Sequence, residues 1–378
     1  TKNYHTLVNK KKIVMGGENS AGFATSDFSG ESNTASWHMT AINEVGAEIE
    51  MNNASSHGMV VSRTAVPIGS DSKFENKGSI TLNGIKSGGI TLLAQLPGGA
   101  INTGTITIKG DNSFGLYSEV NSNIVNETAG NIFVSGTATK SMGIRVGNAN
   151  ATNMSNKGTI TIDSTAGDNM GVYSATAAFE NEGKINVNGN KNIGMYFTGT
   201  TGTNKNNGTI TVAGTNGYGV MLGNSAIFEN TKNINATGAT SMGVYTENST
   251  VTNATGATIS SSLHHGVVQK GGTLTNDGNI STAAGGKAGL YSENGTFVHS
   301  GGVISSTNGG IALFNSNSNG TVSAEINVGN STATHTGIGV YSDGTGKTTF
   351  NTGAKLVLGE KTVGLYSANA SNFENVFE

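Results

Sequence analysis

The sequence of 378 residues contains no cysteine, two prolines and few charged side chains. Without cysteine there is no disulfide framework of the kind that stabilises small secreted domains. With only Pro67 and Pro97, the chain cannot be collagen-like, although glycine supplies 57 residues. Charged residues make up 12% of the chain and the net charge is -3, which excludes the basic surface that nucleic-acid-binding proteins present.

Long apolar runs and helix-forming residues are also scarce. No apolar run approaches the ~18 residues that a membrane-spanning helix needs, and Leu, Glu, Lys and Arg are too few for a helical solenoid. The 35% of apolar residues is too much for a disordered linker. The abundance of Gly, Asn, Thr and Ser is instead typical of many short strands joined by tight turns.

A short phrase recurs along the chain. It reads Met-Gly-Val-Tyr at 170–173 and Ile-Gly-Met-Tyr at 193–196, and between Gly171 and Gly310 its glycine returns every 21 to 25 residues. A period in this range is typical of a solenoid. The glycines of the phrase are Gly22, Gly58, Gly89, Gly115, Gly143, Gly171, Gly194, Gly219, Gly243, Gly266, Gly289, Gly310, Gly339 and Gly364.

Each copy carries three apolar rows that alternate with polar residues. One row flanks the glycine, as Met142 and Ile144 do; one is a pair such as Ile106 and Ile108; one is a single residue such as Phe179. Alternation with period 2 indicates strands. The sequence therefore predicts an all-β fold, a parallel β-helix with three short strands per rung and about 14 rungs of roughly 21–30 residues.

Two other repeat architectures fit less well. Leucine-rich repeats have a similar period but need several leucines per copy, whereas this chain mostly uses Ile, Val, Met and Phe. A βαβ array needs a helical crossover, and no helical segment is predicted. Residues 1–50 are less regular, and we interpret them as a cap or as the first rungs; residues 51–378 are predicted to form the β-helix.

An asparagine stands two residues before a glycine in many copies. Asparagine tolerates left-handed turns, and its amide can bond to the copy above. We therefore predict an internal asparagine ladder at one corner, in which His299 replaces one asparagine. The ladder residues are Asn76, Asn102, Asn156, Asn181, Asn206, Asn230, Asn253 and Asn276.

The glycine and the tyrosine of the phrase are both predicted to face outward, because the glycine lies between two residues taken as inward. Arg145 replaces tyrosine in one copy, which a buried row would not accept. The tyrosine row either stacks sugar rings or an extended peptide, or packs on itself and supports the strands. Tyr173, Tyr196 and Tyr245 are its candidate ligand-binding residues.

Three irregular segments interrupt the repeat, at residues 27–45, 61–73 and 93–100. Binding residues often lie on loops that a rigid scaffold holds. These segments are therefore either ligand loops or covers for the open end of the coil. The candidate ligand-binding residues in them are Trp37, Arg63, Asp71 and Lys73.

No catalytic, metal-binding or cofactor-binding residue is predicted. The seven aspartates fall on separate copies, without the clustering that calcium binding or acid–base catalysis needs. His264 and His265 adjoin, but no cysteine or acidic cluster completes a metal site, and we interpret His265 as a hydrogen-bonded core residue. We therefore predict that the chain is not an enzyme, although neighbouring rungs can bring distant residues together.

The segments FENEGKINVNG, GVYSATAAFEN, GLYSENGTF and GVYTENSTVTN resemble the passenger repeats of large type V autotransporters. They are most similar to the fusobacterial outer-membrane adhesins of the RadD type, from about residue 50 onward. The resemblance implies a passenger at the cell surface of a Gram-negative bacterium, attached to the outer membrane through a C-terminal β-barrel that this sequence lacks. It carries over no ligand residue, because the matched motif is scaffold.

The resulting functional expectation is a segment of a surface adhesin. It would attach to host cells or to other bacteria through glycan or protein receptors, by multivalent and non-catalytic contact. We expect no nucleic acid partner, no cofactor and a monomer. The alternatives that stay open are a β-helical polysaccharide lyase or glycoside hydrolase, and a pore-forming or cytotoxin-like passenger.

Overall fold

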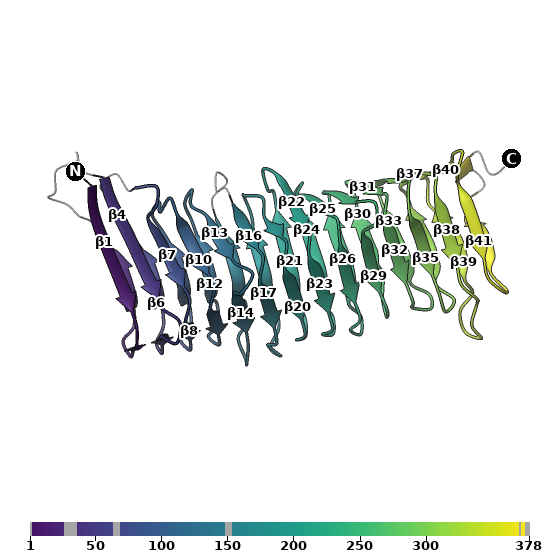
Figure 1. Ribbon diagram of the computed structural model, residues 1–378. Coiled ribbons are helices and arrows are strands. Elements are labelled where there is room, and N and C mark those ends of the chain that lie inside the picture. The colour runs from purple at the N-terminus through teal and green to yellow at the C-terminus, as the bar shows by residue number, and fades with distance from the viewer. Residues whose placement is uncertain (1, 26–35, 63–68, 148–152, 370–371, 375–378) are drawn as a thin grey trace. The chain divides into compact units, whose positions relative to one another are not determined.

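The structure is a computed structural model that describes residues 2–25, 36–62, 69–147, 153–369 and 372–374. These residues form a right-handed parallel β-solenoid with three sheets, three strands per rung and no helix (Figure 1). The predicted fold class is confirmed. The handedness is new, because sequence periodicity does not distinguish a right-handed from a left-handed coil.

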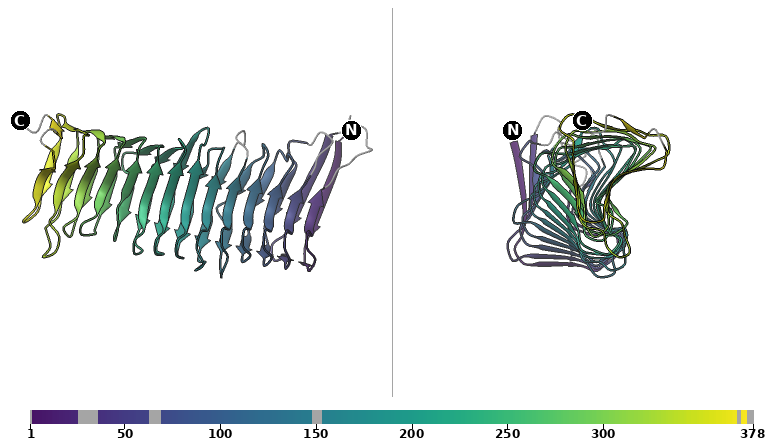
Figure 2. Two further views of the ribbon diagram at one scale, coloured as in Figure 1. Left: turned by 180° about the vertical axis from the view of Figure 1, so that it is seen from behind. Right: turned by 90° about the vertical axis from the view of Figure 1, so that its right-hand side faces the viewer.

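The chain divides into two compact units, unit 1 over Thr1–Asn192 and unit 2 over Ile193–Glu378. Within each unit, strands far apart in sequence lie side by side (Figure 2). Among the described residues the second sheet has seven strands in each unit, which agrees with the predicted number of rungs.

In unit 1 the strands follow one another in the order first, second, third sheet. The first sheet contains β1 (Lys2–Asn9), β4 (Ser36–Asn43), β7 (Lys73–Asn76), β10 (Gly99–Asn102), β13 (Ile124–Asn126), β16 (Met154–Asn156) and β19 (Glu180–Asn181). The second contains β2 (Lys12–Met15), β5 (Glu48–Met51), β8 (Ser79–Leu82), β11 (Thr105–Ile108), β14 (Asn131–Val134), β17 (Thr159–Ile162) and β20 (Lys184–Val187). The third contains β3 (Ala21–Thr25), β6 (His57–Val61), β9 (Gly88–Leu92), β12 (Phe114–Ser118), β15 (Met142–Val146) and β18 (Met170–Ser174).

Unit 2 repeats this order. Its first sheet contains β22 (Thr203–Asn206), β25 (Ile227–Asn230), β28 (Thr250–Asn253), β31 (Thr273–Asn276), β34 (Thr296–His299), β37 (Asn319–Val322), β40 (Thr348–Phe350) and β43 (Phe373–Glu374). The second contains β23 (Thr209–Val212), β26 (Asn233–Ala236), β29 (Thr258–Ser261), β32 (Asn279–Thr282), β35 (Val303–Ser306), β38 (Glu325–Val328) and β41 (Lys355–Leu358). The third contains β21 (Ile193–Thr198), β24 (Tyr218–Gly223), β27 (Met242–Glu247), β30 (Val267–Lys270), β33 (Ala288–Glu293), β36 (Ile311–Ser316), β39 (Ile338–Asp343) and β42 (Val363–Ser367).

The second sheet supplies the most regular part of the core. Ile80, Ile106 and Ile132 are in register on successive strands, and none of them is exposed. Burying one such side chain contributes about 1.5–3 kcal/mol relative to leaving it in water. The alternating row predicted from the sequence is therefore the inner face of this sheet.

The asparagine ladder is confirmed at the corner where the first sheet ends. In unit 1 each Asn Nδ2 donates to the Oδ1 of the next asparagine at 2.7–2.8 Å, from Asn9 to Asn181. In unit 2 the same bonds run from Asn206 to Asn276 at 2.7–2.9 Å. Asn276 then bonds to Nδ1 of His299 at 3.0 Å, so His299 does replace an asparagine.

The predicted outward orientation of the phrase glycines is wrong. A Cβ built on Gly143 would point into the coil, 2.6 Å from the carbonyl oxygen of Gly171 and 3.0 Å from Cγ2 of Ile160. The alternation fails here because the strand turns inward at two consecutive residues, Gly143 and Ile144, both buried. The residue before the glycine, such as Met142, is correspondingly half-buried rather than a core residue.

The first fifty residues contribute β1 to β5. β4 pairs with β7 in parallel and β5 pairs with β8, so these strands continue the sheets of unit 1.

The tyrosine of the phrase is turned outward, as predicted, and Tyr173 is half-buried beside its neighbours in the third sheet.

Candidate ligand-binding surfaces

The described residues contain no group of three or more His, Cys, Asp or Glu side chains that could hold a metal ion. Nor does any helix in the described part of the chain have the length and apolar character needed to cross a membrane.

The segment 61–73 is tied to the scaffold where it is described. Asp71 Oδ1 contacts Nδ1 of His38 on β4, and the ring of Tyr4 stacks on His38 with centroids 4.5 Å apart. Lys73 begins β7, and its Nζ lies 3.0 Å from Glu75. Arg63 lies outside the described residues.

The His38–Asp71 pair has the form of an imidazole oriented by a carboxylate. Such a pair can position a general base when the second ring nitrogen reaches substrate. Nε2 of His38 is buried and has no hydrogen-bond partner among the described residues. The pair therefore holds the segment to β4 without presenting a proton acceptor to solvent.

The described parts of the other two irregular segments also belong to the coil. In the segment 27–45, the residues from Ser36 to Asn43 form β4; the side chain of Trp37 lies outside the described part. In the segment 93–100, Leu96 is fully buried and its N–H donates to Oγ of Ser122 at 2.8 Å. This second segment packs onto the coil.

The residues at the tyrosine position of the phrase form a column on the outer face of the third sheet. In unit 1 this outer column contains the cationic side chain of Arg145 between aromatic rings. Tyr117, Arg145 and Tyr173 occupy the same position on β12, β15 and β18. The guanidinium carbon of Arg145 lies 4.8 Å from the ring centre of Tyr117 and 5.0 Å from that of Phe114. This cation–π contact explains why the column accepts arginine in place of tyrosine.

In unit 2 the same column becomes a continuous stack of rings. The centroid distances are 4.9 Å from Tyr291 to Phe314, 4.5 Å from Phe314 to Tyr341 and 5.0 Å from Tyr341 to Tyr366. The planes are inclined by only 12–27°. Because each ring covers the face of the next, a sugar ring would meet mainly ring edges. This arrangement favours the interpretation that the aromatic row supports the strands over the one that it binds a ligand.

Tyr245 and Tyr196 lie on the same outer column, on β27 and β21. Tyr245 meets Tyr218 edge-on at 5.9 Å, and its hydroxyl donates to the carboxylate of Glu247. Burial and this hydrogen bond raise the pKa of Tyr245, so the phenol stays protonated at any physiological pH. Tyr196 is half-buried and pairs with Met221.

His264 and His265 contact each other edge-on at 4.7 Å. The N–H of Ala288 donates to Nδ1 of His265 at 2.9 Å, so His265 is hydrogen-bonded as predicted, although only half-buried. Burial, aided by the nearby His264 and Lys287, lowers the pKa of His265 to about 4. His265 is thus neutral at physiological pH.

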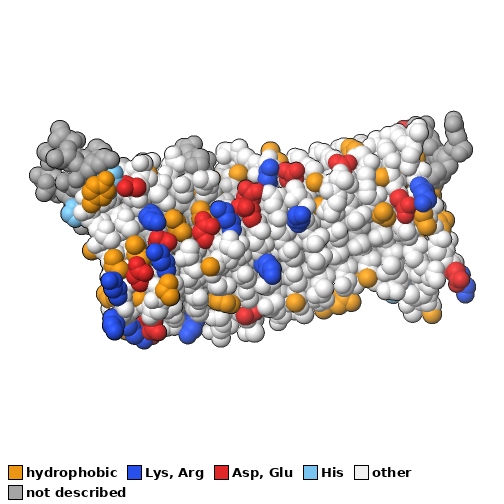
Figure 3. Space-filling view, viewed as in Figure 1, with side chains coloured by type: hydrophobic (Ala, Val, Ile, Leu, Met, Phe, Trp, Pro, Cys, Tyr) orange, Lys and Arg blue, Asp and Glu red, His pale blue; other side chains and the backbone are white. Residues whose placement is uncertain are grey.

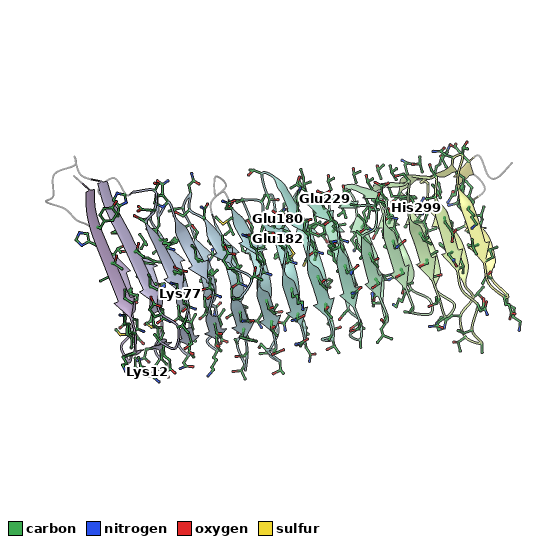
Figure 4. All side chains as sticks on the ribbon, viewed as in Figure 1. Lys12, Lys77, Glu180, Glu182, Glu229 and His299 are labelled. Carbon is green, nitrogen blue, oxygen red and sulfur yellow. The ribbon has the colours of Figure 1, made fainter. Side chains whose placement is uncertain are left out.

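Charged side chains are denser on the visible face of unit 1 than on that of unit 2 (Figure 3). Some of the charged side chains of unit 1 form ion pairs. Lys12 Nζ lies 3.2 Å from Glu48 and 3.1 Å from Glu50, and Lys77 Nζ lies 3.8 Å from Glu75; Lys12 and Lys77 are labelled in Figure 4. Exposed pairs of this kind contribute little stability but leave little net charge at the surface.

One hollow opens on unit 1 where the first sheet turns into the second. We call it the turn notch; it is lined by residues 46–48, 77–79 and 103–105 and by Ala129, and has a volume of about 390 Å³. The turns at 44–47 and 127–130 are four residues long, whereas those at 77–78 and 103–104 are two. The two long turns stand on either side of the two short ones, which creates the hollow.

Sequence reasoning missed two polar features besides the notch. Serines stack at the turn between the second and third sheets: the N–H of Ser87 donates to Oγ of Ser113 at 3.0 Å, and that of Ser113 to Oγ of Ser141 at 3.1 Å. These serines stand at a constant offset, two residues before the phrase glycine. In unit 2 the fully buried Gln269 bonds to Ser292 and to the carbonyl of Thr296, with no comparable repeat to reveal it.

Comparison with known families gives one match. Residues 2–127, about a third of the chain, match the model of the BigA third pectate lyase-like domain. No curated protein and no solved structure matches the chain. Over these residues the chain is thus similar to a β-helical domain of bacterial surface proteins, which suggests a surface-exposed bacterial protein.

Proposed function

We propose that the chain is a segment of an adhesin on the surface of a Gram-negative bacterium. It attaches to host cells or to other bacteria through glycan or protein receptors, and it performs no chemical step. We include in this proposal that the adhesin is of the RadD type, which the repeats resemble. The observation that carries it is the match of residues 2–127 to a β-helical domain of bacterial surface proteins.

The physical basis is a scaffold held together by its own repeats. Asparagine and serine columns in unit 1 and an aromatic column in unit 2 connect one rung to the next, so each unit presents its own outer surface in a fixed arrangement. A fixed surface loses little conformational entropy on binding, and several copies on one cell add avidity. Both properties suit attachment.

The proposal is tested by competition. Fluorescently labelled chain is added to epithelial cells and to a panel of oral and gut bacteria, with unlabelled chain, single sugars or single amino acids as competitors. We expect saturable binding that unlabelled chain abolishes and that one class of small competitor reduces. Binding that unlabelled chain does not reduce would contradict an adhesin.

A polysaccharide-cleaving enzyme is the second candidate, and the match of residues 2–127 to a pectate lyase-like domain favours it. Incubation with polygalacturonate and with neutral polysaccharides distinguishes the two proposals. An enzyme would release unsaturated products that absorb in the ultraviolet, or new reducing ends. We expect neither, and either product, lost in a His38→Gln variant, would establish catalysis.

A further inference from the structure

We propose that the turn notch of unit 1 is a binding site for a neutral sugar residue of a glycan. This inference rests on the proposed adhesin function, to which it adds a place and a ligand class. The notch has a volume of about 390 Å³, within the ~300–1,000 Å³ of small-molecule sites.

The shape of the notch follows from the lengths of four turns. In each long turn the last N–H closes onto the first carbonyl: Ala47 onto Glu44 at 3.0 Å, and Gly130 onto Glu127 at 2.7 Å. These closed turns form two walls, and the short turns between them form a floor two rungs wide, on the order of 10 Å. One sugar ring can lie between such walls.

Unused hydroxyl groups line the floor. Glu48, Ser79 and Thr105 are in register on β5, β8 and β11 and point outward. Within the described part of the chain the side chains of Ser79 and Thr105 make no hydrogen bond to protein, whereas the hydroxyl of Thr103 donates to the carbonyl of Asn76 at 3.2 Å. A column of one carboxylate and two hydroxyls offers the donors and acceptors that successive sugar hydroxyls require.

The charges of the notch favour a neutral ligand. Its lining holds one carboxylate, Glu48, and one ammonium group, Lys77, so the formal charge of the lining is zero. Glu48 also lies 3.2 Å from Lys12, and Lys77 lies 3.8 Å from Glu75. An acidic sugar would bring its carboxylate toward Glu48, and like charges at close range are unfavourable. A hydroxyl that donates to Glu48 instead forms a charge-assisted hydrogen bond.

The test compares three variants of the full chain. Thr105→Tyr fills the notch, and Ser79→Tyr fills it from the neighbouring strand. Thr209→Tyr is the matched control, because Thr209 begins a Thr-Ile-Thr strand of unit 2 after the same kind of two-residue turn. The probes are immobilised neutral disaccharides of glucose, galactose and their N-acetylhexosamines, with polygalacturonate for comparison; melting temperatures check folding.

We expect wild-type chain and Thr209→Tyr to bind at least one neutral disaccharide equally, and both notch variants to lose at least tenfold in affinity. Equal binding by the notch variants, binding of polygalacturonate alone, or no binding of any neutral disaccharide would overturn the inference. Cell attachment of the same proteins separates the two proposals. If Thr105→Tyr still attaches to cells, the notch fails while the adhesin stands; if wild-type chain does not attach, the adhesin itself fails.

Discussion

At the scale of single residues, the phrase glycines are the positions that tolerate least. In most copies, such as those of Gly58, Gly143 and Gly219, they pack inward, where two constraints meet: the isoleucine side chain of the second sheet and the carbonyl oxygen of the next glycine along the coil. At Gly219 a Cβ would lie 2.5 Å from Cγ2 of Ile234 and 2.6 Å from the oxygen of Gly243. A backbone carbonyl cannot move aside without disturbing the strand pairing, so packing favours glycine at this position. One copy has the small residue Ala312 instead, which is fully buried.

Gly219→Val is therefore expected to destabilise unit 2 by about 1–3 kcal/mol through overpacking. Urea unfolding measures the change, and limited proteolysis should show new cleavage near residues 214–222. Gly223→Val, on the same strand, is the control, because its Cβ would meet only Thr198 at 3.9 Å. Equal effects of the two substitutions would contradict the inward packing of Gly219.

The ladder asparagines are expected to be nearly as sensitive. Asn253→Ala removes an acceptor from Asn230 and a donor from Asn276, both fully buried. Leaving such groups unpaired costs about 1–3 kcal/mol each. The urea midpoint should fall markedly, whereas Asn327→Ala, on the outer face of β38, should leave it almost unchanged. A midpoint for Asn253→Ala within error of wild type would show that the ladder is not a stabilising feature.

His299 makes the ladder sensitive to acid. Its Nδ1 accepts from Asn276 and its Nε2 donates to the carbonyl of Glu325, so only the neutral ring satisfies both bonds. Burial lowers its pKa below the unfolded value of about 6.5. Between these pKa values the unfolded chain binds more protons, so this contribution to stability is present above pH ~6.5 and declines as the pH falls.

The measurement is the urea midpoint at several pH values from 7.5 to 4.5. His299→Asn should flatten the profile relative to wild type, because the amide restores the ladder without a titrating group. His265→Asn removes a second histidine whose pKa is lowered, to about 4, and should flatten it separately. An unchanged slope in His299→Asn would mean that His299 does not couple folding to pH.

At the scale of elements, each strand is specified by what it stacks on. The inner isoleucine row and the asparagine corner could be predicted from sequence because each recurs at a fixed offset in most copies. The orientation of the glycines could not, because strict alternation was carried across a point where Gly143 and Ile144 both turn inward. The turn notch depends on differences in turn length between successive rungs, which a repeat alignment treats as irregularity.

The aromatic stack of the third sheet gives a prediction at this scale. Phe314→Leu keeps apolar area but removes two ring contacts, with Tyr291 and Tyr341. Aromatic pairs contribute ~0.5–1.5 kcal/mol beyond their area, so a loss of about 1–3 kcal/mol is expected in urea unfolding. Tyr366→Leu, at the end of the stack, removes one contact and should cost about half as much. A Phe314→Leu protein that is stable but no longer attaches to cells would instead assign the stack to ligand binding.

At the scale of the whole molecule, the fold class and the function are inferred from different features of the sequence. Composition and period were sufficient for the fold class, since a glycine-rich, cysteine-free chain with a repeat near 23 residues has few other solutions. Function did not follow from the repeat, because the repeated residues are scaffold. The proposed function rests on the similarity of residues 2–127 to a surface-protein domain and on the outer features that differ from rung to rung.

The central claim is that the chain attaches to a surface without altering it. The most direct measurement is a cycle of binding, release and rebinding on whole cells, with labelled chain quantified at each step. The account predicts saturable binding, and the same amount of fresh chain bound after the first portion has been washed off. A second binding that falls in proportion to the time of first contact would show that the chain consumes its receptor, and would contradict a non-catalytic adhesin.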